Sequence, residues 1–363
     1  MSLSRTVSWG LRVFLVGFAA AGGVAAVGDT PVAARAPSLI AELEPIEGVD
    51  FIWVTALNNR GQAVGAGVRE LQDEPGLWTG LSWRSTAPIL LRVPEGARGT
   101  WPHAINNRGL IAGETDFGDR TQATLWRKGK PKLLPELPDG LGSTALALND
   151  RGQAAGTVLT ADDYWLAAVW TGRRLRTLPP LPETTHSEAH ALNNRGKVAG
   201  VSLTFSEGTE GEIIVRRATS WHGRHATALG EPEGTTESDV LDLNDRGDVV
   251  GWAAGDSGMV LPAAWSKRGP RLLPLPEGAI GGMASAVDSR GRVVGWVGDD
   301  NGVRMLLWTA RGTFDLSALV PESLGWTTLF PEDLNDRGEI VGQGDLNGKR
   351  AAFRLRIPKR LLR

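Results

Sequence analysis

Two histidines and two aspartates break an otherwise regular pattern in this sequence, and their side chains are the ones best suited to acid–base chemistry. His103 and His190 each precede an alanine, in the segments HAIN and HALN. Asp242 and Asp333 replace that alanine in two copies of the segment DLND. Imidazole and carboxylate groups that converge on one pocket can transfer protons in a lyase or a hydrolase. The same groups stabilise a fold when Arg or backbone N–H groups partner them, so both roles remain open.

Three tryptophans also lie outside the positions that the rest of the sequence repeats. They are Trp53, Trp101 and Trp326, and Tyr164 with Trp165 adds a further aromatic pair. Aromatic rings beside carboxylates bind carbohydrates or peptides by stacking and hydrogen bonding. Packing beneath loops is the alternative role. Together with His103, His190, Asp242 and Asp333, the three tryptophans are our candidate binding residues.

Other segments with chemical potential have simpler explanations. The repeated Asn-Asp pairs lack the alternating oxygen ligands and terminal bidentate acid of a calcium loop, and an Arg follows each pair. Residues 255–258, GDSG, resemble the nucleophile segment of trypsin-like proteases, but no matching His and Asp segments accompany them. His222 and His225 lack a third metal ligand. We therefore predict no metal site, no cofactor and no catalytic residue, although propeller folds do host enzymes.

A motif that recurs seven times must position all of these residues. Each copy has a pair of residues that is apolar in five copies and Asp-Leu in two, then Asn or Asp, a polar residue, Arg-Gly, and a short run that ends in Gly. The copies are ALNNRGQAVG (56–65), AINNRGLIAG (104–113), ALNDRGQAAG (147–156), ALNNRGKVAG (191–200), DLNDRGDVVG (242–251), AVDSRGRVVG (286–295) and DLNDRGEIVG (333–342). A fixed period of this length is typical of a propeller or a solenoid.

Each repeat contains the signals of four short strands. The motif predicts a hairpin, with Asn or Asp accepting a backbone hydrogen bond and Gly in the left-handed conformation of a type I turn with a G1 bulge. An aromatic third strand follows, ending in Trp83, Trp126, Trp170, Trp221, Trp265, Trp308 and Phe353, and then a leucine-rich fourth strand. No repeat contains ten residues of helical period. We therefore predict an all-β, seven-bladed β-propeller of four-stranded antiparallel blades.

The count of fourth strands predicts how the ring closes. Six leucine segments that end in Pro and an acid follow the aromatic strands, and the seventh, SLIAELEPIEG (38–48), precedes the first repeat. We expect this N-terminal strand to complete the last blade and so remove an open edge. The alternative is that residues 358–362 supply the seventh fourth strand.

The expected domain organisation is simple. Arg5 and Arg12 followed by an apolar run that ends in Val-Ala-Ala predict a Sec-type export signal over residues 1–26, cleaved near Ala26. A linker is expected over residues 27–37, the propeller over 38–357 and a C-terminal tail over 358–363. The 363 residues contain no Cys, which excludes disulfides and thiolate sites. The formal net charge of −2 argues weakly against nucleic acid or an anionic membrane surface as a partner.

The repeated unit resembles that of the HAF family of probable extracellular repeat proteins, in which A-x-(A)-I-N-N/D-x-G-Q-V-V-G precedes A-F-L-W. The resemblance covers residues 38–355 and includes the ending DLSALVPESLGW (315–326) and DLNDRGEIVGQGDLNGKRAAFRL (333–355). It implies export and a repeat fold similar to kelch-type propellers. It implies no reaction, cofactor or substrate.

The loops between second and third strands and the connections between blades should share one face, and both sets are acidic. The first set has Glu70, Asp73, Glu74, Asp116, Asp119, Asp162, Asp163, Glu207, Glu210, Asp299 and Asp300, and the second has Glu95, Asp139, Glu183, Glu233, Glu277 and Glu322. We predict a secreted, monomeric binding module that recognises a glycan, a peptide or an extracellular protein through this face. Two alternatives stay open: a propeller lyase or hydrolase, and an adhesive surface protein without a defined pocket.

Overall fold

The computed structural model describes residues 39–49, 51–71, 74–208, 211–300 and 302–362. Residues 1–38 and residues 39–363 are two separate units, and the propeller is the second unit. The predicted export signal and linker therefore lie outside the described residues. Among the described residues, no helix has the length and apolar character needed to cross a lipid bilayer.

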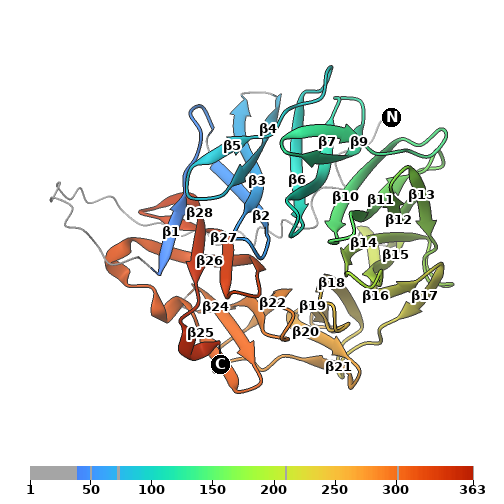
Figure 1. Cartoon of the computed structure of the whole chain (residues 1–363). Helices are drawn as coiled ribbons and strands as arrows, with labels where there is room; N and C mark the ends of the chain where they lie inside the picture. Colours follow the sequence, from blue (N-terminus) through green and yellow to red (C-terminus); the bar gives the residue numbers. More distant parts are fainter. Residues whose placement is uncertain (1–38, 50, 72–73, 209–210, 301, 363) are drawn as a thin grey trace. The chain divides into compact units, whose positions relative to one another are not determined.

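Seven four-stranded antiparallel sheets form a ring, as predicted (Figure 1). The first strands of neighbouring sheets contact each other all the way round, from β2 to β26 and back to β2. Blades 1 to 3 consist of β2 (Phe51–Leu57), β3 (Ala63–Leu71), β4 (Glu74–Trp83) and β5 (Pro88–Leu90); β6 (Gly99–Ile105), β7 (Leu110–Asp116), β8 (Thr121–Arg127) and β9 (Lys130–Leu133); and β10 (Gly142–Leu148), β11 (Gln153–Leu159), β12 (Trp165–Thr171) and β13 (Arg174–Leu178).

The remaining blades follow the same order of strands. Blades 4 to 6 consist of β14 (His186–Leu192), β15 (Val198–Gly208), β16 (Gly211–His222) and β17 (His225–Ala228); β18 (Glu237–Leu243), β19 (Val249–Ala254), β20 (Val260–Ser266) and β21 (Gly269–Leu272); and β22 (Gly281–Val287), β23 (Val293–Asp299), β24 (Gly302–Thr309) and β25 (Gly312–Asp315). Blade 7 consists of β26 (Trp326–Leu334), β27 (Glu339–Leu346), β28 (Lys349–Arg356) and β1 (Ile40–Leu43).

The N-terminal strand closes the ring, which confirms the first of the two predicted closures. β1 pairs antiparallel with β28, with Ile40 opposite Leu355 and Leu43 opposite Ala352. Residues 358–362 instead contain the 3₁₀ turn η4 (Lys359–Leu361), while η2 (Ser317–Leu319) and η3 (Glu322–Leu324) lie in the connection from blade 6 to blade 7. Blade 7 therefore joins the two ends of the propeller through backbone hydrogen bonds.

The seven motif copies form the hairpins between first and second strands. In the first copy Asn58 Oδ1 accepts hydrogen bonds from the N–H groups of Arg60 and Gln62, at 2.9 and 3.0 Å. Gly61 has φ +77°, the left-handed value that a type I turn with a G1 bulge requires. The second glycine of the motif has a different role: a Cβ at Gly156 would lie 1.9 Å from the Thr144 carbonyl oxygen. Both glycines are therefore needed by the backbone.

Tryptophans in the third strands fill the spaces between blades. Trp83, Trp126, Trp170 and Trp221 are among the largest fully buried side chains. Trp126 Nε1 donates to the Arg92 carbonyl at 3.0 Å, in the connection after the fourth strand of the preceding blade. The equivalent bond from Trp83 reaches the Glu44 carbonyl at 3.2 Å, just beyond β1. Because Glu44 takes the place of Arg92, side-chain packing confirms the same closure as backbone pairing.

Candidate functional site

The antiparallel blades give the ring two ends with different content. The seven motif hairpins and the turns from third to fourth strand lie at one end, which we call the hairpin end. The turns from second to third strand and the connections between blades lie at the other, the loop end. Each first strand runs from the loop end to the hairpin end, so its residues sample both. The candidate residues divide between these ends.

A polar pocket of about 220 Å³ lies at the hairpin end, where the seven hairpins meet. It is lined by the two polar residues of every motif copy together with Asp242 and the apolar residue that precedes each pair. These polar residues are Asn58, Asn59, Asn106, Asn107, Asn149, Asp150, Asn193, Asn194, Asn244, Asp245, Asp288, Ser289, Asn335 and Asp336. No Lys or Arg lines the pocket among the described residues.

In six of the seven blades, the first residue of the pair is an Asn whose amide links the blade to the next one. Asn58 Nδ2 donates to the Asn106 carbonyl at 3.0 Å, and Asn106 Nδ2 donates to the Asn149 carbonyl at 2.9 Å. The series continues round the ring until Asn335 Nδ2 donates to the Asn58 carbonyl at 3.1 Å. The Oδ1 atom of the same amide accepts hydrogen bonds from the N–H groups of the turn. One residue type therefore shapes the hairpin and joins the blades.

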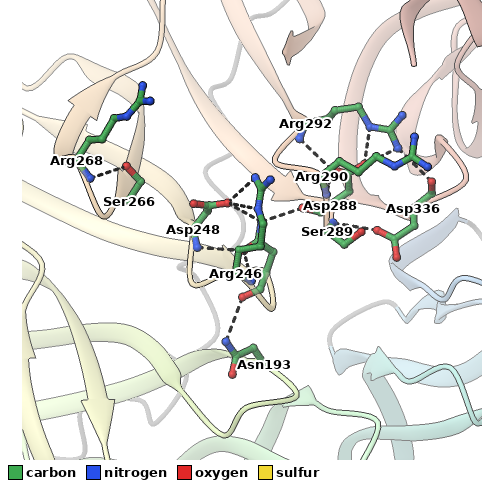
Figure 2. A network of polar contacts seen from close by, with 11 residues as sticks. Asn193, Arg246, Asp248, Ser266, Arg268, Asp288, Ser289, Arg290, Arg292 and Asp336 are labelled. Atoms are coloured by element: carbon green, nitrogen blue, oxygen red, sulfur yellow. Dashed lines mark hydrogen bonds and ion pairs between the residues drawn. The ribbon is translucent and has the colours of Figure 1, made fainter. Parts of the chain in front are cut away.

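Blade 6 lacks the amide and compensates with an arginine (Figure 2). Asp288 stands where the other blades have Asn, and a carboxylate has no N–H group to donate. Arg292, which is four residues later, contacts Asp288 Oδ2 at 2.5 Å and donates from Nη2 to the Asp336 carbonyl at 3.1 Å. That carbonyl belongs to the neighbouring blade, so the guanidinium restores the missing link. Both side chains are buried.

The second residues of the pairs are also arranged in a circle at the pocket, and most of them bond to the next blade. Asn59 N donates to Asn107 Oδ1 at 2.8 Å, and Asp336 N donates to Asn59 Oδ1 at 2.8 Å. Ser289 N donates to Asp336 Oδ1 at 2.9 Å. Burial raises the pKa of Asp336, but hydrogen bonds from Ser289 and Asn59 and the charge of Arg292 outweigh it and lower the pKa. The carboxylates of this circle therefore serve as acceptors for neighbouring blades.

The two predicted aspartates, Asp242 and Asp333, also join blades. Asp242 Oδ2 accepts the Val287 N–H at 2.8 Å, and Asp333 Oδ2 accepts the Leu57 N–H at 2.6 Å. Each carboxylate bonds the N–H of the following residue of its own chain through Oδ1, at 2.7 Å. Backbone partners thus hold both aspartates, which was one of the two roles that the sequence left open.

The two predicted histidines occupy a β-bulge in the first strand. The strand register shifts between Pro102 and Ala104, and between Ala189 and Ala191, so that His103 and His190 are the extra residues. A bulge turns its extra residue away from the regular alternation. His103 Nε2 lies 3.4 Å from Glu114 Oε1 and is buried with it. Both histidines therefore face partners from neighbouring strands.

Glu114 connects blade 2 to blade 3. Thr144 Oγ1 donates to Glu114 Oε2 at 2.5 Å. Burial raises the pKa of Glu114, against the opposing effects of His103 and Thr144, so its carboxyl group holds a proton more readily than an exposed glutamate. The sequence patterns did not single out Glu114, because it lies in a second strand and outside the motif.

His190 lies between two carboxylates. Its Nε2 is 3.2 Å from Glu188 Oε2, and its Nδ1 is 3.1 Å from Asp239 Oδ1 and 2.8 Å from the Val240 carbonyl. All three partners are acceptors, so both ring nitrogens carry hydrogen. Burial lowers the pKa of His190, but Asp239 and Glu188 outweigh it and raise the pKa to about 10. Arg216 contacts Asp239 from the other side at 3.4 Å. His190 is therefore a charged link between blades 4 and 5.

The structure separates the three predicted tryptophans. Trp53 and Trp101 occupy equivalent positions in the first strands of blades 1 and 2, where both are half-buried. Trp101 stacks on Trp78, with ring centroids 3.8 Å apart, and on His103 at 5.6 Å. Trp326 is only 8% exposed and packs edge-on against Phe353 within the core of blades 6 and 7. The proposed grouping of all three at one mouth therefore reduces to Trp53 and Trp101.

A second aromatic cluster lies at the loop end of blades 3 and 4. Tyr164, Trp165 and Phe205 surround His186, with centroid distances of 5.4, 5.9 and 4.8 Å from its ring. Tyr164 is 46% exposed, and it follows the exposed Asp162 and Asp163 in the turn. Burial lowers the pKa of His186, although Asp163 and Glu188 oppose the shift. This cluster presents an aromatic surface beside acids.

Acidic side chains surround both aromatic groups at the loop end. Those exposed at this end are Glu95, Asp119, Asp139, Asp162, Asp163, Glu183, Glu233, Glu277, Asp300 and Glu322, while Asp116 and Asp299 are half-buried. The side chains of Glu70, Asp73, Glu74, Glu207 and Glu210 lie outside the described residues. Among the described residues, no three His, Asp or Glu side chains are grouped so as to hold a metal ion.

Apart from Asp242, the residues of the pocket and of the His186 cluster are not among the predicted site residues. The motif was interpreted as turn chemistry alone, yet a polar residue repeated at the innermost hairpin of every blade must form a ring about the axis. That signal was present in the sequence. The His186 cluster had only a partial signal, from Tyr164 and Trp165, because Phe205 and His186 come from other strands.

Comparisons with known proteins support the fold and no specific function. No family model and no curated protein matches the chain. The propeller domain of the Trilobed protease from Pyrococcus furiosus, described as having an open velcro topology, has a TM-score of 0.54 and 10% identity, covering 84% of this chain and 95% of that domain. YCF48 bound to D1 peptide has a TM-score of 0.50 and 11% identity, covering 91% of this chain and all of that one. A seven-bladed propeller is shown, and no specific function.

Proposed function

We propose that the protein is an exported binding module that recognises a glycan, a peptide or another surface protein through the loop end. The observation that carries this proposal is the aromatic cluster around His186, in which Tyr164 is 46% exposed beside Asp162 and Asp163. An aromatic face stacks on the apolar face of a sugar ring or on a side chain, and carboxylates accept hydroxyl or ammonium groups. Trp53 and Trp101 offer a second aromatic surface at the same end of the ring.

Binding is favoured over catalysis by the state of the ionisable groups. His103, His190, Asp242 and Asp333 all bond protein groups of their own or a neighbouring blade. A general acid or base must have a proton or a lone pair that can reach the substrate and is not already used in a bond to the protein. His190 in particular is held as an imidazolium by three acceptors. The groups exposed at the loop end are aromatic rings, scattered carboxylates and a few cations, which include Arg98, Arg120, Lys349 and Arg350.

Export and family membership belong to the same proposal. The seven motif copies are similar to those of the HAF repeat proteins, and a kelch-like exported propeller is what that resemblance implies. Export predicts a mature chain that begins at Val27, after Ala26. N-terminal sequencing of the protein recovered outside the cytoplasm tests this directly. A chain recovered only inside the cell with its first residues intact would contradict it.

The binding proposal is tested on glycan and peptide arrays with the exported protein. Tyr164→Ala should weaken binding to any retained ligand by at least about tenfold, because an aromatic anchor at the contact is removed. His222→Ala is the matched control, since it removes an exposed ring at the hairpin end. Failure to retain any ligand, or equal binding by both variants, would reject recognition through the His186 cluster.

A further inference from the structure

The hairpin end carries a ring of arginines around its polar pocket. Each motif copy places one Arg directly after its Asn/Asp pair, and all seven side chains are exposed. This arginine ring consists of Arg60, Arg108, Arg151, Arg195, Arg246, Arg290 and Arg337. Arg246 contacts Asp248 at 2.7 Å. Within the described part of the chain, the other six guanidinium groups have no hydrogen bond or ion pair.

A second set of cations lies outside the arginine ring. The turns from third to fourth strand point to the same end, and in blades 1 to 6 each contains at least one exposed Lys or Arg. These outer cations include Arg84, Lys128, Arg173, Arg224, Lys267 and Arg311. Neither these turns nor the motif hairpins contain an exposed Asp or Glu in the described residues. The exposed charged side chains of these turns and hairpins are therefore all basic, although the half-buried Asp150, Asp245, Asp248 and Asp336 also lie at this end. We call this end the basic face.

The composition concealed this separation of charge. A formal net charge of −2 argued against an anionic surface as a partner, because the total says nothing about where charges lie. The 39 Lys and Arg residues and the 41 Asp and Glu residues of the whole chain nearly cancel, whichever end they occupy. Only the fold sorts them, since it sends alternate turns to opposite ends. The net charge of the whole chain therefore does not exclude an anionic partner for the hairpin end.

The ends of the propeller chain lie at the same basic face. The Leu39 carbonyl accepts the Arg356 N–H at 2.9 Å, at the end of β28 that leads to the hairpin side. Ile357 N donates to the Gly338 carbonyl at 2.8 Å, within the blade 7 hairpin. The exposed Lys359 and Arg360 follow.

We propose that the hairpin end docks on an anionic lipid surface. Cations on all seven blades form a two-dimensional array, which a planar surface meets all at once and a linear polymer meets only in part. Arg suits phosphate because its planar guanidinium donates two parallel hydrogen bonds and is weakly hydrated. Docking at this end would leave the acidic loop end directed away from the lipid. The inference goes beyond the proposed function, because it concerns the opposite face.

Vesicle co-flotation of the full chain tests the proposal. The vesicles are phosphatidylcholine alone or an equimolar mixture with phosphatidylglycerol. The ring variant replaces Arg60, Arg108, Arg151 and Arg195 by Gln, and the matched control replaces Arg98, Arg120, Lys349 and Arg350 at the loop end by Gln. The two variants have the same net charge and the same N-terminal segment. Circular dichroism and thermal unfolding establish that both are folded.

The expected result is specific to the lipid charge and to the face. The wild type and the control variant should float with the anionic vesicles, and the ring variant should lose affinity by on the order of 100-fold. Raising the salt concentration should weaken the wild type in the same direction. Equal flotation of the two variants, or no preference for phosphatidylglycerol, would overturn the proposal.

A soluble polyanion distinguishes the lipid from other anionic partners. Binding of heparin or duplex DNA that depends on the arginine ring, without binding to anionic vesicles, would assign the face to a polymer and reject the lipid. Array binding through Tyr164 is measured on the same ring variant. Its retention there keeps the two proposals separable, because the loop-end ligand should not depend on the arginine ring.

Discussion

Hydrogen bonds join neighbouring blades at the hairpin end and in the loop half of the ring, but the donors are of one type at the hairpin end and of several types in the loop half. At the hairpin end one residue type repeats the same bond, from Asn58 to Asn106 and onward round the ring. In the loop half of the first strands, a carbonyl at one fixed position accepts a different donor in each of three places. Thr55 Oγ1 donates to Pro102, His190 Nδ1 to Val240, and Gln343 Nε2 to Val54.

The difference shows where the repeat is free to change. A hairpin residue shapes a turn and bonds a neighbour simultaneously, so its replacement needs a second change, as Asp288 needs Arg292. In the loop half of the first strands, the bond to the neighbouring carbonyl is supplied by side chains of three different types. Divergence among blades is therefore concentrated at the loop end, where residues such as Tyr164, our proposed anchor for a ligand, can be introduced without loss of the ring.

We expect the largest loss of stability when a buried tryptophan of a third strand is replaced, because these side chains fill the space between blades from one end to the other. Trp170 is 1% exposed and donates from Nε1 to the Pro135 carbonyl at 2.8 Å. We expect Trp170→Ala to lower the free energy of unfolding by about 4 kcal/mol in urea titrations, since a large cavity forms. Trp170→Phe should cost about 1 kcal/mol, because it keeps most of the packing and loses one hydrogen bond. Similar losses for the two variants would contradict this packing role.

Blade 6, in which Arg292 takes over the bond of the missing Asn amide, should give the second largest loss of stability. Arg292→Gln leaves the buried Asp288 without its cation, and we expect a loss of about 3 kcal/mol in the free energy of unfolding. The double variant Asp288→Asn with Arg292→Gln recreates the pair Asn149 and Gln153 of blade 3. Its stability should lie within about 1 kcal/mol of wild type. Additive losses in the double variant would show that Arg292 does not replace the amide.

The charged link at the loop end should give a smaller effect that depends on pH. The pKa of His190 is about 10 in the folded chain against 6.5 in a free histidine. A raised pKa stabilises the fold fully below about pH 6.5, and this contribution is lost as the pH rises toward about 10. We expect wild type to lose more of its free energy of unfolding than His190→Gln over that interval, as measured by chemical denaturation. Parallel pH profiles of the two proteins would contradict a charged His190.

The sequence was sufficient for the fold because the repeat supplies seven readings of one pattern. Blade number, hairpin type and closure by β1 all followed from positions that recur, including the Glu44 carbonyl that takes the place of Arg92. Contacts between blades that involve non-recurring residues did not follow. His190 meets Asp239 across 49 residues, and Phe205 meets Trp165 from another blade, and no periodicity encodes such pairs. The basic face was hidden because a sum of charges has no direction.

The most direct test of the division between the ends is one array measurement on three proteins. Wild type, Tyr164→Ala and the four-residue arginine ring variant are compared on the same glycan and peptide arrays. The account predicts that wild type and the ring variant retain the same ligand and that Tyr164→Ala loses at least about tenfold in affinity. A ligand that Tyr164→Ala retains and the ring variant loses would place recognition at the hairpin end and contradict the account.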